Sequence, residues 1–225
     1  MIEAVIFDMD GLLVDSEPEW FRARVDLLRQ YGVTWSEADQ LAMAGVHTDV
    51  WVEALHDKLS GALTSAQVLE EIVARMAGYY ERGEVPILPG APDAVAACAE
   101  RYRVGLASGS PQRLIDACLV GAGWTTYFET LISSDELEHG KPAPDVYLEI
   151  MRRMELDPRT TAVVEDSGAG IKSGKAAGTK VVAVPNKHTN PGPDVLELAD
   201  TRIGTLHELT GALAEIGGQV GSHDA

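Results

Sequence analysis

Five short apolar runs, rich in β-branched residues, recur along this chain, and helical patterns separate most of them. They cover residues 4–7, 103–107, 129–132, 162–164 and 180–184. Strands that are apolar almost throughout, without alternating polar residues, are typical of a parallel sheet that helices cover on both faces. The sequence therefore predicts an α/β fold built on a parallel sheet.

The interval 16–85 differs from the rest because it contains no strand-like run. Thr48 and Ser65 each precede a helical pattern, where a hydroxyl can cap the first turn. The pattern predicts an all-helical cap over residues 16–85, inserted into a core made of residues 1–15 and 86–225. A cap placed there would lie over the strand ends and could exclude water from them.

Composition restricts the partners of a chain this long. Its 225 residues include 35 acidic and 18 basic side chains, for a formal charge of -17, which disfavours nucleic acid and anionic membranes as partners. No apolar run approaches the ~20 residues of a membrane span. Cys98 and Cys118 lack metal-binding or redox spacing, so we expect buried thiols in a reducing compartment. We expect a cytoplasmic protein that is a monomer or a weak dimer.

Two carboxylates follow the first strand, two residues apart. Asp8 and Asp10 stand where Gly11 allows the chain to turn. A single acid could cap the next helix or close the turn, but a second negative charge beside it needs an offsetting cation. The pair therefore indicates a site for a hard cation and a phosphoryl group.

Other polar residues stand at comparable places in the sequence. Ser108 follows the second strand, Lys141 lies in a loop, and Glu165 with Asp166 follows the fourth strand. Taken singly, each has an ordinary structural explanation as a loop hydroxyl, a surface lysine or a helix cap. Because the carboxyl ends of parallel strands meet at one edge, we expect all of them to converge there with the first-strand acids.

At this point the sequence resembles the haloacid dehalogenase superfamily of phosphohydrolases, in the branch of β-phosphoglucomutase and the hexose and hexitol phosphate phosphatases. Four motifs carry the resemblance, in order along nearly the whole chain: residues 7–17, 107–110, 140–145, and 165–167 with Gly170. The resemblance implies a Rossmann-like, doubly wound core with a helical cap, acting on a small phosphorylated metabolite.

The charges of the predicted site require a metal. Asp8, Asp10, Glu165, Asp166 and a phosphomonoester dianion would bring six negative charges together, against one positive charge from Lys141. At ~4 Å each like-charge pair costs about 4 kcal/mol at an effective dielectric near 20. Mg²⁺ suits such oxygen ligands, and we expect it to bind the carboxylates of Asp8 and Asp166 and the backbone carbonyl of Asp10. Glu165 is expected to act through water.

The resemblance also implies the catalytic roles. Asp8 is expected to attack phosphorus and form an aspartyl phosphate. Asp10 is expected to protonate the leaving oxygen and later to deprotonate the attacking water. Ser108, Gly109 and Lys141 are expected to bind the phosphate oxygens.

The predicted cap departs from the mutase relatives. Trp20 stands where those relatives have a histidine that transfers a proton, and an indole cannot do so. This favours a phosphatase over a mutase, with Trp20 either stacking on the substrate or simply packing in the cap. Gly45 and Val46 precede His47, where relatives have an arginine, so His47 is a weak candidate for substrate contact.

Three functions are compatible with this sequence. The leading one is a Mg²⁺-dependent phosphatase for a sugar or sugar-alcohol phosphate, and the second is a sugar phosphate mutase on the same scaffold. The third is a non-catalytic phospho-acceptor module, which also uses clustered acids, a hydroxyl and a lysine. Such a module would carry no cap and would phosphorylate an aspartate after a central strand, so the predicted insertion and the Asp8–Asp10 spacing disfavour it.

Overall fold

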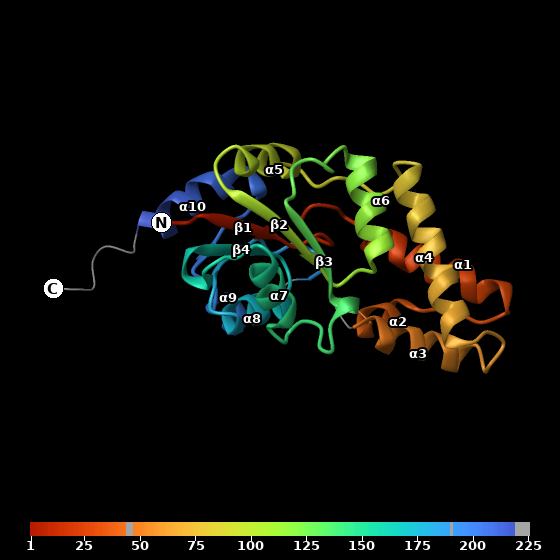
Figure 1. Ribbon diagram of the computed structural model, residues 1–225. Coiled ribbons are helices and arrows are strands. Elements are labelled where there is room, and N and C mark those ends of the chain that lie inside the picture. Colours follow the sequence, from red (N-terminus) through yellow and green to blue (C-terminus); the bar gives the residue numbers. More distant parts are fainter. Residues whose placement is uncertain (44–46, 190, 219–225) are drawn as a thin grey trace.

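A single parallel sheet forms the centre of the protein (Figure 1). The computed structural model describes residues 1–43, 47–189 and 191–218. The sheet has the strand order β3-β2-β1-β4-β5-β6, and every pairing in it is parallel. The strands are β1 Ala4–Phe7, β2 Arg103–Ser108, β3 Thr130–Ser133, β4 Thr161–Glu165, β5 Lys180–Ala183 and β6 Thr201–Arg202. The predicted α/β class is confirmed, and β1, which carries the catalytic candidates at its end, is a central strand.

Helices account for most of the remaining chain. Between β1 and β2 come α1 Glu17–Gln30, α2 Glu37–Ala42, α3 Thr48–Lys58, α4 Ser65–Glu81 and α5 Ala91–Ala99. After β2 come α6 Gln112–Ala122, α7 Asp145–Arg153, α8 Gly168–Ala176, α9 Pro193–Leu196 and α10 Leu209–Gly218. The described residues within 16–85 form helices and connecting turns without a strand. This segment is therefore helical as expected, while its exact limits as a domain stay a prediction.

The two faces of the sheet are packed by different helices. In β1, Val5 and Phe7 belong to a buried cluster that includes side chains of α5, α6 and α10. Ile6 points the other way, into a second buried cluster with side chains of α7 and α8. This alternation follows from the two-residue period of a strand, and it explains why β1 is apolar at every position.

Two connections join α1–α4 to the sheet, and they lie side by side. The amide of Asp15 donates to the carbonyl of Pro86 at 2.8 Å, and the amide of Leu88 donates to the carbonyl of Leu13 at 2.9 Å. Gly11 takes a φ of 81°, and a Cβ there would lie 2.4 Å from Asp166 Oδ2. Only glycine fits this turn, which brings the chain after β1 against the end of β4.

Some sequence predictions need correction. β6 was not predicted, because a strand of two residues leaves no apolar run to detect. Ser108 and Glu165 are the last residues of β2 and β4 rather than the first residues after them. Both side chains are consequently buried, with no exposed surface.

The two cysteines are buried free thiols, as expected. Burial raises the pKa of the Cys98 thiol to about 12, so it is protonated and unreactive at neutral pH. No helix within the described ranges is long and apolar enough to cross a membrane.

Candidate active site

A cavity of about 310 Å³ lies where α1, α2 and α3 face the carboxyl ends of the strands. The predicted residues that line it come from both parts of the chain: Asp8, Asp10, Gly109 and Lys141 from the sheet side, and Trp20 and His47 from the helical segment. Three other predicted residues, Ser108, Glu165 and Asp166, are buried behind this wall. The structure therefore brings the separate motifs together at one edge of the sheet.

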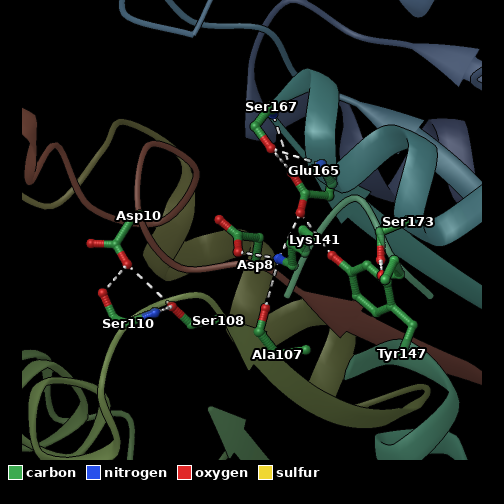
Figure 2. Close-up of polar contacts among 12 residues, drawn as sticks. Asp8, Asp10, Ala107, Ser108, Ser110, Lys141, Tyr147, Glu165, Ser167 and Ser173 are labelled. Atoms are coloured by element: carbon green, nitrogen blue, oxygen red, sulfur yellow. Dashed lines mark hydrogen bonds and ion pairs between the residues drawn. The ribbon is translucent and has the colours of Figure 1, made fainter. Parts of the chain in front are cut away.

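Lys141 links two of the acids (Figure 2). Its ammonium group donates to Asp8 Oδ1 at 2.5 Å and to Glu165 Oε1 at 2.7 Å, and also to the Ala107 carbonyl at 3.0 Å. The Lys141 side chain is 8% exposed. An ammonium group has three protons, and all three are used here, so the position of Asp8 beside the cavity is fixed.

Glu165 is held by a second set of donors, all drawn in Figure 2. The Tyr147 hydroxyl donates to Oε1 at 2.8 Å, and the amide and hydroxyl of Ser167 donate to Oε2 at 3.1 and 3.0 Å. A Cβ on Gly170 would overlap the Glu165 carboxylate, so glycine is required there. The Glu165 carboxylate thus positions Lys141.

Burial and mutual repulsion dominate the electrostatics of this cluster. Burial, reinforced by Glu165, raises the pKa of Asp8 to about 8, although Lys141 lowers it. Burial and the same neighbouring carboxylates raise the pKa of Asp166 well above its usual value. Burial alone would lower the pKa of Lys141, but Asp8 and Glu165 together raise it well above its ordinary value. The cluster therefore has more negative charge than one ammonium group can offset.

The donor set fits a divalent cation. Asp8, Glu165 and Asp166 can each offer a carboxylate oxygen, and these oxygens lie within 4.8 Å of one another. Asp166 Oδ2 accepts from Asn186 at 2.9 Å, whereas Asp166 Oδ1 is buried and has no hydrogen-bond donor among the described residues. An orphaned buried carboxylate oxygen beside two other acids is what a hard cation with oxygen ligands would satisfy.

Asp10 lies apart from the lysine cluster and is surrounded by hydroxyl groups (Figure 2). Ser16 donates to Oδ1 at 2.6 Å. Ser108 and Ser110, which Figure 2 shows beside Asp10, donate to Oδ2 at 3.1 and 2.7 Å. The Ser108 hydroxyl, which we expected to bind phosphate, therefore points to Asp10 in this structure. Ser110, two residues later, lines the cavity instead, together with Gly109.

Two tryptophans form part of the wall on the side of the helical segment. Trp20 and Trp51 pack edge to face with their ring centroids 5.7 Å apart. His47 caps the start of α3, and its ring lies against Gly140, next to Lys141. Gly45 and Val46, which precede His47, lie outside the described residues.

Sequence reasoning missed several residues of the site. Asn186 could have been found by the rule that located the others, because it follows a strand, β5, by three positions. Ser16, Ser110 and Tyr147 carry no such signal, since hydroxyls near strand ends are common. Glu17 and Arg24, on the helical side of the cavity, were missed because their place depends on how the helices pack.

Comparison with known proteins identifies the family of this chain. The family model of haloacid dehalogenase-like hydrolases matches residues 2–178. Hexitol phosphatase B of Escherichia coli K12 is 37% identical over 212 residues, which cover 93% of this chain and 95% of that protein. A phosphorylated carbohydrates phosphatase of Thermotoga maritima is 29% identical over 219 residues, covering 96% and 100%.

Solved structures share the arrangement of the elements. A β-phosphoglucomutase of Clostridium difficile, 21% identical, superposes with a TM-score of 0.79 over 97% of this chain and 98% of its own. At that identity the likeness shows the fold, including the helices inserted after the first strand. The matched family model covers most of the chain and every sheet-side motif described above. The chain therefore belongs to the haloacid dehalogenase-like hydrolases.

Proposed function

We propose that this protein is a Mg²⁺-dependent phosphatase that hydrolyses a small phosphomonoester, a sugar or sugar-alcohol phosphate, through an aspartyl phosphate on Asp8. One observation carries the proposal: a buried lysine holds one oxygen of Asp8 at 2.5 Å, beside a cavity that a small metabolite can enter. The names of the phosphatase relatives support the substrate class. We also expect the enzyme to act in the cytoplasm as a monomer or a weak dimer.

In the first half-reaction, a carboxylate oxygen of Asp8 attacks phosphorus while the bond from phosphorus to the substrate alcohol oxygen breaks. Lys141 stabilises the charge that spreads over the phosphoryl oxygens. Gly109 and Ser110 line the same cavity, and we expect them to contact these oxygens. The product of this step is the alcohol and a phosphorylated Asp8.

Asp10 supplies the proton transfers. It gives a proton to the departing alcohol oxygen, then takes one from the water that attacks the aspartyl phosphate and releases inorganic phosphate. The three serine hydroxyls fix its carboxyl group next to the cavity rather than in contact with Lys141. General acid and base catalysis of this kind contributes typically ~10²–10⁴ in rate.

Asp8 and Asp166 are the residues that would hold Mg²⁺, with the backbone carbonyl of Asp10 as the expected third protein ligand. When bound, the ion neutralises negative charge on the substrate phosphate. Glu165 already accepts hydrogen bonds on both oxygens, which suits an indirect contribution through Lys141 and water.

The cavity favours hydrolysis over mutase chemistry. Trp20 lines it at the place where the mutase relatives are expected to have a proton-transferring histidine. An indole ring has no group that could activate a second sugar phosphate, so the aspartyl phosphate should react with water.

The test is phosphate release from a panel of sugar, sugar-alcohol and sugar-acid phosphates, measured with Mg²⁺ and after treatment with a chelator. We expect release with Mg²⁺ and loss of nearly all of it without metal. Full activity in the chelator-treated enzyme would contradict the metal requirement. No release from any member of the panel would contradict the proposed function.

A further inference from the structure

One face of α1 forms a wall of the active-site cavity, starting at the end of the cavity that is near Asp10. Glu17, Trp20 and Arg24 all line the cavity, at the i, i+3, i+7 spacing of a single helix face. Glu17 is at the end near Asp10, because it follows Ser16, whose hydroxyl binds Asp10. At 1.5 Å per residue, Arg24 lies about 10 Å further along the helix axis.

Arg24 is a buried cation without an anionic partner. It is 4% exposed, and Nη1 donates to Gln40 Oε1 at 2.8 Å, while Nε has no acceptor among the residues with described positions. Gln40 Nε2 in turn donates to Glu17 at 3.2 Å, so the amide stands between the two charges. No ion pair links Arg24 to a carboxylate within the described ranges.

Aromatic rings hold the guanidinium group in this position. Its central carbon lies 5.1 Å from the Trp20 ring centroid and 5.6 Å from that of Trp51. Burial lowers the pKa of Arg24 to about 10, and Glu17 opposes this shift, so the group is still charged at neutral pH. Buried cations are normally paired with an anion, and a cation against a cavity can take that anion from a ligand.

We infer that Arg24 binds a carboxylate at the end of the substrate remote from the phosphate, which makes phosphorylated sugar acids of about six carbons the preferred class. This inference rests on the proposed phosphatase function. An extended six-carbon chain with its phosphate spans about 8 Å at the ~1.2 Å per bond of an extended chain. That length is similar to the ~10 Å rise of α1 between Glu17 and Arg24.

A carboxylate fits this position better than a second phosphate or a hydroxyl. Its single negative charge balances one guanidinium group and can accept two parallel hydrogen bonds from it. A phosphate dianion would bring one more negative charge than a single guanidinium group balances. A neutral hydroxyl would leave the buried charge of Arg24 uncompensated.

The test compares substrates that differ only at the remote end. 6-Phosphogluconate and glucitol 6-phosphate have the same six-carbon chain, with a carboxylate or a CH₂OH group at C1, and glucitol 1,6-bisphosphate places a phosphate there. We expect kcat/KM for 6-phosphogluconate to exceed that for glucitol 6-phosphate by about 10- to 100-fold, as for a hydrogen bond between charged groups. The Arg24→Gln variant should lower this ratio to within about threefold of one.

A matched control lies on the same helix. Arg29→Gln removes a guanidinium group whose side chain is 75% exposed and pairs with Asp26, outside the cavity, and should keep the wild-type ratio. If Arg24→Gln does not fold, Arg24→Lys tests the same point, because it keeps the charge but loses the two-pronged contact and should lower the ratio in part.

The outcomes separate this inference from the proposed function. Equal kcat/KM for the acid and the neutral compound in the wild type would overturn the inference while the phosphatase function stands. A preference for the bisphosphate would also overturn it. An unchanged ratio in a folded Arg24 variant would show that the residue only packs between the tryptophans. Absence of hydrolysis of every compound would instead contradict the proposed function.

Discussion

The two sides of the cavity satisfy their charges differently. On the sheet side, every proton of the Lys141 ammonium group is donated, and both oxygens of Glu165 accept hydrogen bonds from neighbouring groups. On the helical side, Arg24 has one protein acceptor and two aromatic neighbours. The hydrogen bonds of Lys141 and Glu165 are complete before any substrate arrives, and Asp166 Oδ1 is the oxygen left for a cation. On the helical side, Arg24 still has an N–H group without an acceptor among the described residues.

This difference indicates that the sheet side carries out the reaction and that the helical side selects the substrate. A saturated network of buried ions holds its groups in one geometry, which is what attack on phosphorus requires. A wall with unsatisfied donors gains most from a ligand that supplies the missing acceptor. Substitutions on the sheet side should therefore lower the rate with every substrate, and substitutions on the helical side should change the ranking of substrates.

The largest effect is expected at Asp8. Asp8→Asn keeps the size of the side chain but replaces the attacking carboxylate with an amide, so kcat should fall by at least about 10⁴-fold with every substrate. Asp116→Asn is a matched control, because Asp116 is exposed on α6 and bonded by Gln112. If a pure Asp8→Asn sample released phosphate in the steady state near the wild-type rate, the claim that the sheet-side residues carry out the reaction would be wrong.

A smaller loss is expected at Asp10. Asp10→Asn removes the proton donor but retains the nucleophile and the phosphate contacts, so kcat should fall by about 10²–10⁴-fold. The loss should shrink for substrates with good leaving groups, such as p-nitrophenyl phosphate, because their alcohols need no proton to depart. An equal loss for sugar phosphates and p-nitrophenyl phosphate would argue against a role in protonation.

The smallest effect concerns stability and pH. The pKa of Asp8 in the metal-free protein, about 8, lies above its unfolded value near 4. The folded state therefore binds this proton more tightly, and that contribution to the free energy of unfolding is full below pH ~4 and is lost as pH rises to about 8. Mg²⁺ replaces the proton, so it should raise Tm by a few degrees more at pH 8 than at pH 5.5.

Thermal unfolding with Mg²⁺ or with a chelator, at both pH values, measures this difference. Asp8→Asn should show a smaller difference in the Mg²⁺-dependent Tm shift between the two pH values, and the difference that remains comes from Asp166, whose pKa burial also raises. The same Mg²⁺-dependent shift at both pH values in the wild type would mean that Asp8 does not control metal binding.

The fold could be predicted from the sequence because strands that are buried on both faces are apolar at nearly every position. Runs such as residues 4–7 and 162–164 are apolar at every position, and parallel strands place their carboxyl ends together. The same rule located Asp8, Asp10, Lys141, Glu165 and Asp166 at one edge. It could not show that the Ser108 hydroxyl turns to Asp10, since that depends on rotamers and on the neighbouring Ser110.

The helical wall was much harder to predict. An arginine in an amphipathic helix usually lies on the solvent side, and nothing in the local sequence distinguishes Arg24 from Arg22 or Arg29. Its burial results from the packing of α1 against α2 and α3, which supply Gln40 and Trp51. Contacts between elements of this kind leave no periodic signal in one sequence.

Detection of a phosphoryl group on Asp8 tests the central claim most directly. The Asp10→Asn variant, with Mg²⁺ and its best substrate from the panel, should accumulate the intermediate because hydrolysis lacks its base. After an acid quench, mass spectrometry should find the added mass of one phosphoryl group on the peptide that contains Asp8, and Asp8→Asn/Asp10→Asn should lack it. Release of phosphate by the single variant without any adduct, or with an adduct on another residue, would contradict the account.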